Sequence, residues 1–109
     1  MAYDQALAER ILDLLAGERE VGAKKMFGGL CVLWRGNMLV GVVGDELMVR
    51  VGPEAWADCL ALPHTREMDF TGHSMKWMVY VGAAGIESDA DLDAWVERAR
   101  TFVGRLPPK

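Results

Sequence analysis

"KKMFGGLCVLW", residues 24–34, places two glycines directly before an uninterrupted apolar run. A phosphate-binding loop needs glycines whose amides converge on an anion at a helix N-terminus, commonly with a lysine after them. Here both lysines precede the glycines, and the run that follows is typical of a strand. The pattern therefore predicts that Gly28 and Gly29 serve the backbone, as a bulge, a positive-φ turn or a close approach between chain segments.

Short strand-like runs continue beyond this stretch. They occupy residues 30–34, 37–43, 46–51, 66–70 and 75–82. Gly44-Asp45 between the second and third runs is a good signal for a two-residue hairpin, and the last two runs suit a second hairpin. The first two runs do not alternate cleanly between apolar and polar residues, which predicts strands that are central or covered on both sides.

Three further segments carry the apolar period of a helix, at residues 4–16, 53–62 and 88–104. Asp4 and Ser88 suit the N-cap, Pro53 suits the first helical position, and Gly104 suits the end of the last helix. Residues 18–24 read as a polar connection. The sequence therefore predicts one α+β domain over residues 1–109, in the order α-β-β-β-α-β-β-α, with helices packed on an antiparallel sheet.

Composition and charge narrow the class of protein. The 109 residues fit one domain, and 51% of them are apolar, enough for one core. A net charge of −4 argues against direct nucleic-acid binding, because a phosphate backbone needs a basic face. We find no signal-peptide pattern and no membrane-length apolar run, so we expect a cytoplasmic protein without membrane contacts. Cys31 and Cys59 stand in apolar contexts and are predicted to be buried free thiols.

Residues 64–73 offer the main alternative to a binding module. A metal or ligand site there would gather His64, Glu67, Asp69, His73 and Cys59. Only two histidines exist, they lack the i, i+4 spacing of a helical zinc site, and no spacing places a base beside a nucleophile. We therefore predict no catalytic residues, no metal and no cofactor. A metal- or small-ligand-binding protein, or an enzyme that uses this region, is the alternative.

Two groups of residues are candidates for contact with a partner. The first is Lys24 and Lys25 with the adjacent Met26 and Phe27, a mixed basic and apolar stretch suited to a protein partner. A solvated loop is the other interpretation of that stretch, and burial of Phe27 would favour it.

The second group comes from the third and fifth strand-like runs. Leu47, Val49 and Val51 alternate with Glu46, Met48 and Arg50, which predicts one buried face and one mostly wet face. In the last run, Met75, Trp77, Val79 and Val81 share one face, and Lys76, Met78 and Tyr80 share the other. If these two strands lie near one another, Met48, Met78 and Tyr80 form an uncovered apolar patch, and hence an interface for a second copy or a partner.

A basic pair, Met-Phe-Gly-Gly, a hairpin with glycine and a short alternating strand follow one another in residues 24–51. In this order, and more weakly through residues 75–81 and 87–100, the chain resembles the N-terminal domain of the TfoX/Sxy family of bacterial competence regulators. The resemblance implies a fold of the type III secretion chaperone kind. It also implies a transcriptional co-regulator of DNA-uptake genes that acts through the cyclic-AMP receptor protein or RNA polymerase.

Full-length members of that family carry a second, helical domain, whereas this chain ends in "RLPPK". We therefore expect a stand-alone domain, and the family brings no catalytic residues with it. The sequence thus predicts a small non-enzymatic regulatory or protein-binding module with a protein partner. It is also compatible with a homodimer.

Overall fold

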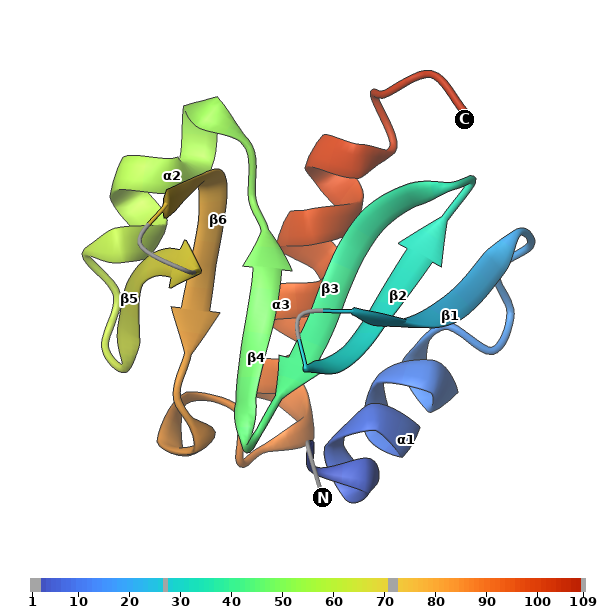
Figure 1. Cartoon of the computed structure of the whole chain (residues 1–109), viewed down its shortest axis with the longest axis horizontal. Coiled ribbons are helices and arrows are strands. Elements are labelled where there is room, and N and C mark those ends of the chain that lie inside the picture. The colour runs from blue at the N-terminus through green and yellow to red at the C-terminus, as the bar shows by residue number, and fades with distance from the viewer. Residues whose placement is uncertain (1–2, 27, 71–72, 109) are drawn as a thin grey trace.

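The computed structural model describes residues 3–26, 28–70 and 73–108, without the side chains of residues 26, 68–70 and 73–76. Within these residues, three α-helices lie against one face of a six-stranded antiparallel sheet (Figure 1). This confirms the predicted α+β fold. In chain order the elements are α1 (Gln5–Leu14), β1 (Val21–Met26), β2 (Gly29–Trp34), β3 (Asn37–Val43), β4 (Glu46–Arg50), α2 (Pro53–Leu60), β5 (Thr65–Phe70), β6 (His73–Val81), the 3-10 turn η1 (Ala83–Gly85) and α3 (Asp89–Val103).

The first four strands form a meander joined by two-residue turns. Each turn holds a glycine at positive φ: Gly28 at +74°, Gly36 at +80° and Gly44 at +58°. After α2 the chain forms β5, and then β6 inserts between β4 and β5, giving the strand order β1-β2-β3-β4-β6-β5. The strands β1 and β5 are therefore the two edges of the sheet.

The edge strand β1 is an element that the sequence analysis missed. Residues 18–24 are predicted as a polar connection, but residues 21–26 pair with β2 from Val21 beside Trp34 to Met26 beside Gly29. Two lysines, a glycine and an alanine leave β1 without an apolar alternation. It forms because the tight turn after Met26 brings it beside β2, and an edge strand needs only one neighbour and no buried face.

The main core lies between the helices and the sheet. All three helices contribute to it, and its fully buried side chains include Ile11 of α1, Leu92 of α3 and Val40 of β3. Leu39 is also fully buried, because the register of β2 and β3 shifts around it and leaves it as the extra residue of a bulge. The two first strand-like runs are thus central strands, as predicted.

A smaller apolar cluster lies on the opposite face of the sheet. Its members among the described side chains all come from strands: Cys31, Met48, Met78 and Tyr80, with Met38 and Val43 packed against them. We call this the helix-free face. The sheet therefore has a helix-covered face that carries the main core and a helix-free face that carries the smaller cluster.

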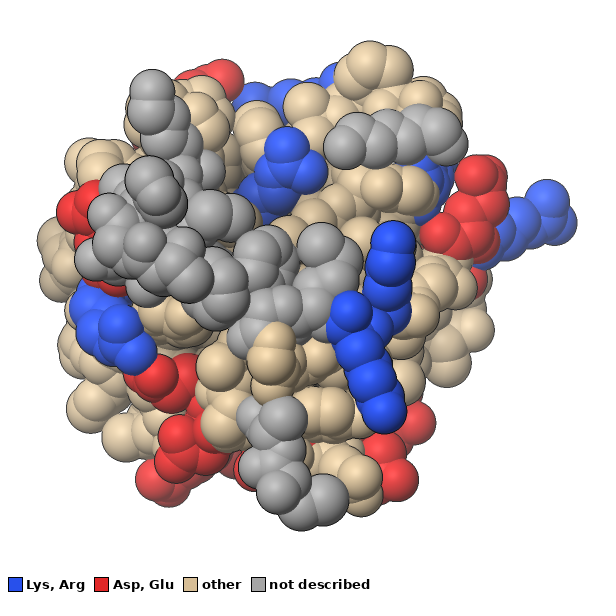
Figure 2. Space-filling model, in the orientation of Figure 1, with Lys and Arg blue, Asp and Glu red and all other residues tan. Residues whose placement is uncertain are grey.

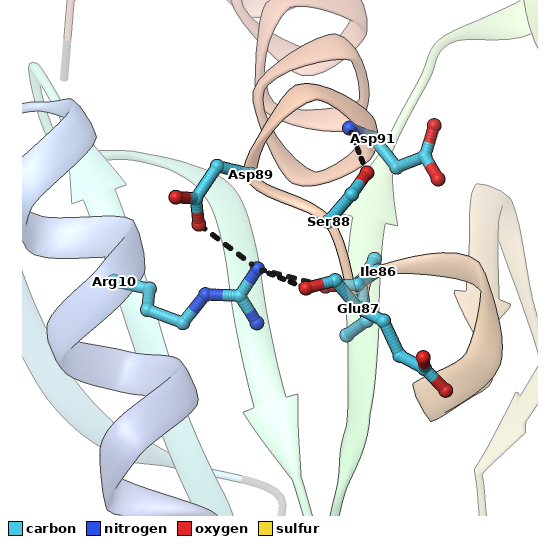
Figure 3. A network of polar contacts seen from close by, with 6 residues as sticks. All are labelled: Arg10, Ile86, Glu87, Ser88, Asp89 and Asp91. Atoms are coloured by element: carbon cyan, nitrogen blue, oxygen red, sulfur yellow. Dashed lines mark hydrogen bonds and ion pairs between the residues drawn. The ribbon is translucent and has the colours of Figure 1, made fainter.

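Arg10 of α1 ties the first helix to the start of the last. Its guanidinium donates to the carbonyl oxygens of Ile86 at 2.9 Å and Glu87 at 3.2 Å, and lies 3.3 Å from a carboxylate oxygen of Asp89 (Figure 3). Beside it, Ser88 caps α3 as predicted, accepting a hydrogen bond at 3.0 Å from an amide of the first turn. The first and last helices are therefore linked to each other at this point.

Other sequence predictions have mixed outcomes. Cys31 and Cys59 are buried and free, as predicted. In the last strand the predicted faces hold for residues 78–81. Trp77 has φ +67° and is 38% exposed, and its ring lies edge-on to that of Trp56 of α2, which packs against the main core. No helix in the described part of the chain is long and apolar enough to cross a membrane.

Candidate partner-binding face and edge

One row of paired residues crosses all six strands on the helix-free face. The backbone pairings run from Lys24 to Cys31, then to Gly41, Met48, Tyr80 and Arg66. Residues paired across antiparallel strands share a face of the sheet, so these six positions lie along one line. The row is apolar in the middle and ends in a cation on each edge strand.

The middle of the row packs closely because one of its residues is glycine. A Cβ on Gly41 would lie 2.3 Å from the terminal methyl carbon of Met48 and 3.1 Å from the carbonyl oxygen of Leu30. The methionine methyl group thus occupies the space of a side chain at residue 41. Burial raises the pKa of the neighbouring Cys31 thiol, so this thiol stays neutral within the cluster.

Met48, Met78 and Tyr80 come together because β4 and β6 are neighbours, but they do not form the uncovered patch that the sequence predicts. Their exposed fractions are 0%, 4% and 6%. The expectation of exposure is wrong because Met38 and Val43 pack against the cluster and Met48 folds over the glycine of β3. Contact of this cluster with a second copy or a partner stays a prediction.

The end of the row on β5 carries a cation with two partners inside the chain. The guanidinium carbon of Arg66 lies 4.2 Å from the ring centroid of Tyr80, close enough for a cation–π interaction. A guanidinium nitrogen of the same residue lies 2.5 Å from a carboxylate oxygen of Glu46 on β4. Sequence reasoning missed this arrangement, since only the strand order places Arg66 beside these two residues.

The end of the row on β1 carries a cation without such partners. Lys24 and Lys25 are both exposed, and neither makes an ion pair or a side-chain hydrogen bond with the described residues. Lys24 pairs with Cys31 on the helix-free face, whereas Lys25 pairs with Leu30, which packs against the main core. Two lysines that the sequence analysis treats as one contact therefore lie on opposite faces of β1. Phe27 and the side chain of Met26, the rest of that predicted contact, lie outside the described residues.

Figure 2 views the helix-free face. Lysine and arginine side chains stand over β5 at the left and over β1 and β2 at the right, and acidic side chains gather along the lower border. Cations therefore stand at both ends of the sheet on this face, although the chain as a whole is acidic.

The main chain of β1 alternates between β2 and the open edge. The amide of Arg35 donates to the carbonyl oxygen of Glu20 at 3.0 Å, just before β1 begins. Because hydrogen-bonded pairs alternate along an antiparallel ladder, Lys24 bonds to β2, whereas the N–H and C=O groups of Ala23 and Lys25 point away from it. No described strand lies on that side of β1, so these groups form an open template for another strand.

The two glycines of the opening stretch shape the turn that holds this edge. Gly28 has φ +74°, in the region that side chains disfavour. A Cβ on Gly29 would lie 2.0 Å from the carbonyl oxygen of Val42, so β2 and β3 approach closely there. The pair thus supplies a positive-φ turn and a close approach, two of the three geometries that the sequence suggests.

The alternative region at residues 64–73 begins with a strained turn. His64 has φ +66° and lines a hollow of about 340 Å³ together with Asp91 and Arg98 of α3. Cys59 is instead buried in the main core, and burial raises the pKa of its thiol. The structure therefore does not bring Cys59 and His64 together as ligands in an open site.

The remaining candidate ligands lie along the second hairpin. Glu67 is paired in register with Val79 in the sheet, while the side chains of Asp69 and His73 lie outside the described residues. Among the side chains that are described, no three from His, Cys, Asp and Glu could hold a metal ion. The metal- or ligand-site alternative thus gains no support from the described part of this region.

Comparison with known proteins identifies the family. A search of curated proteins and a search of solved structures each gave no match, so the likeness to type III secretion chaperones stays a prediction. A family model described as the TfoX N-terminal domain matches residues 13–103, which include all six strands. The chain therefore belongs to the TfoX N-terminal domain family.

Proposed function

We propose that this chain is a non-enzymatic regulatory module that binds a protein of the transcription machinery. Membership of the TfoX N-terminal domain family supports this role, because the family is competence-related and regulatory and is not known as enzymatic. The proposed contact is the β1 edge of the sheet with the adjoining part of the helix-free face.

The observation that carries the proposal is the difference between the two ends of the cross-strand row. Arg66 is held by Glu46 and Tyr80 within the chain, whereas Lys24 is exposed and makes no such contact with the described residues. A cation beside open main-chain groups suits an acidic partner, because charge complementarity steers association and fixes the register of a complex.

Affinity capture from the source cells tests the proposal, using the tagged full chain. We expect wild-type protein to recover a polymerase subunit or a transcription regulator, and Lys24→Glu to lower its recovery at least tenfold. Arg19→Glu is the matched control, because Arg19 is an exposed cation in the turn before β1 and carries the same charge change. Equal recovery of every protein by wild type and Lys24→Glu would contradict the proposed contact.

A homodimer through the helix-free cluster is a separate expectation. Light scattering across a range of concentrations measures it directly, and Tyr80→Glu should lower the mass of a dimer formed through this face. A monomer at every concentration would remove this interface from the proposal and leave the β1 contact in place.

A further inference from the structure

The open edge of β1 suggests how the partner binds, and this inference rests on the proposed function. We infer that the partner contributes an extended segment that pairs antiparallel with β1 as a seventh strand. The segment carries an acidic residue opposite Lys24, with apolar residues on either side of it.

The main chain of β1 provides the first part of the argument. The N–H and C=O groups of Ala23 and Lys25 point away from β2, and β2 is the neighbour of β1 in the strand order. Residues 22–25 are exposed. An incoming strand would thus find two hydrogen-bonding positions ready on a strand that the turn at residue 28 already holds in place.

The second part concerns the face that lies under the edge on the helix side. A hollow of about 220 Å³ lies on that side between the α1 region and β2, lined by Tyr3, Gln5, Ala8, Glu9, Leu12 and Leu30. Leu30 is the partner of Lys25 in the sheet, and Leu12 is 37% exposed. Strand residues opposite Ala23 and Lys25 would share this face, and apolar side chains there would cover Leu12 and Leu30.

The third part is charge, which selects the residue of the incoming strand that lies opposite Lys24, between the two apolar residues. The position opposite Lys24 lies on the helix-free face, where an acidic side chain would reach an exposed lysine that has no ion-pair partner among the described residues. Antiparallel self-pairing centred on Lys24 would instead place the Lys24 side chains of the two copies opposite one another on the helix-free face. Like charges opposite one another destabilise a strand pair, so the geometry favours an acidic segment over a second copy.

Selection from a displayed random octapeptide library on the folded full chain tests the inference. We expect enriched peptides to contain an acidic residue between two apolar residues, and their binding to shift the amide NMR signals of β1. By fluorescence polarisation, Lys24→Glu should weaken a resynthesised peptide at least tenfold, whereas Arg19→Glu should leave its affinity within twofold. Enrichment of peptides that shift signals elsewhere would overturn the inference.

Ala23→Pro removes one outward-pointing N–H and no bond to β2, so the fold should survive while the peptide loses at least tenfold in affinity. Ala23→Val is the matched control, because it keeps the N–H. Unchanged affinity in a folded Ala23→Pro protein would contradict strand addition. If the captured transcription partner also persists in this variant, the proposed function stands and only the binding mode fails.

N-methylated peptides test the same bonds without changing the protein. In the antiparallel arrangement, the amides of the two apolar residues point toward β1 and the amide of the acidic residue points away. Methylating the first two should weaken binding at least tenfold, and methylating the third should leave it within about twofold. Equal effects at all three amides would overturn the inference. So would a dimer that forms through β1 as the protein concentration rises, measured by light scattering.

Discussion

The two edge strands of the sheet differ in how their side chains are held. At β5, the hydroxyl of Thr65 lies 2.5 Å from the carbonyl oxygen of Leu62, and Arg66 is held by Glu46 and Tyr80. The helix α2 also packs against this strand. At β1, residues 22–25 are exposed, and its two lysines make no ion pair with the described residues. At β5 the side chains of Thr65 and Arg66 are held within the chain, whereas the two lysines of β1 are not held by the described residues.

This difference distinguishes a strand edge whose side chains are held in place from one that a partner can reach. An open strand edge is a hazard, and proteins guard it by covering it or by placing charges on it. Covering removes the edge from use, whereas lysines discourage pairing with a like-charged copy and leave the main chain accessible to an acidic segment. The β1 edge is therefore the part of this sheet suited to a partner.

The largest expected effect comes from detaching the open edge. Gly29→Ala places a Cβ 2.0 Å from the carbonyl oxygen of Val42, which main-chain movement alone can relieve. We expect a loss of about 3 kcal/mol in the free energy of unfolding, measured by urea denaturation. Gly22→Ala in β1 is the matched control, because nothing lies within 4 Å of its new Cβ. A loss of similar size in both variants would contradict this account of the turn.

A smaller effect is expected at the tied edge. Thr65→Val removes the hydroxyl that links β5 to the carbonyl groups at the end of α2, and should cost about 1–2 kcal/mol in the free energy of unfolding. In Thr101→Val, the lost hydroxyl donates within its own helix, to the carbonyl oxygen of Glu97 at 2.9 Å, and to no other described residue, so the cost should be below about 0.5 kcal/mol. Equal costs would show that Thr65 does not secure β5.

The cations at the two ends of the row offer a direct comparison. Arg66→Ala loses the stacking on Tyr80 and a solvent-screened ion pair with Glu46, and should destabilise by about 1 kcal/mol. Lys24→Ala loses no such contact with the described residues and should change stability by less than about 0.5 kcal/mol. Chemical denaturation of both variants measures the difference. A larger loss for Lys24→Ala would mean that the β1 cation is structural.

The smallest expected effect concerns the thiol beside β1. Burial raises the pKa of Cys31 above its usual 9.0, so its contribution to stability is full below pH 9 and is lost as the pH rises further. Between pH 8 and 10, the free energy of unfolding of wild type should therefore fall more than that of Cys31→Ala, by less than about 1 kcal/mol. Identical pH profiles would indicate that this thiol ionises as freely in the folded chain as in the unfolded one.

Much of the fold could be predicted because its signals are local. The caps at Asp4 and Ser88, the glycine turns and the helical periods all depend on residues a few positions apart. The strand β1 could not be predicted, because its six residues do not alternate between apolar and polar and its pairing depends on β2. Edge strands of this composition look like polar loops until their neighbour is known.

The candidate site was less predictable, because it depends on which strands are neighbours. Lys24 and Lys25 were identified, but only the register shows that they lie on opposite faces. The prediction that Met48 lies on a wet face is wrong, because burial there depends on Gly41 of another strand and not on alternation within β4. The contacts of Arg66 likewise arise from the order of the strands.

Residue-by-residue hydrogen exchange of β1 in the free protein tests the central claim most directly. The account predicts that the amides of Ala23 and Lys25 exchange nearly as fast as in an unfolded peptide at every protein concentration. The amide of Lys24 should exchange at least tenfold more slowly, because it bonds to β2. Protection of Ala23 and Lys25 equal to that of Lys24 would show that the edge is already covered and would contradict the account.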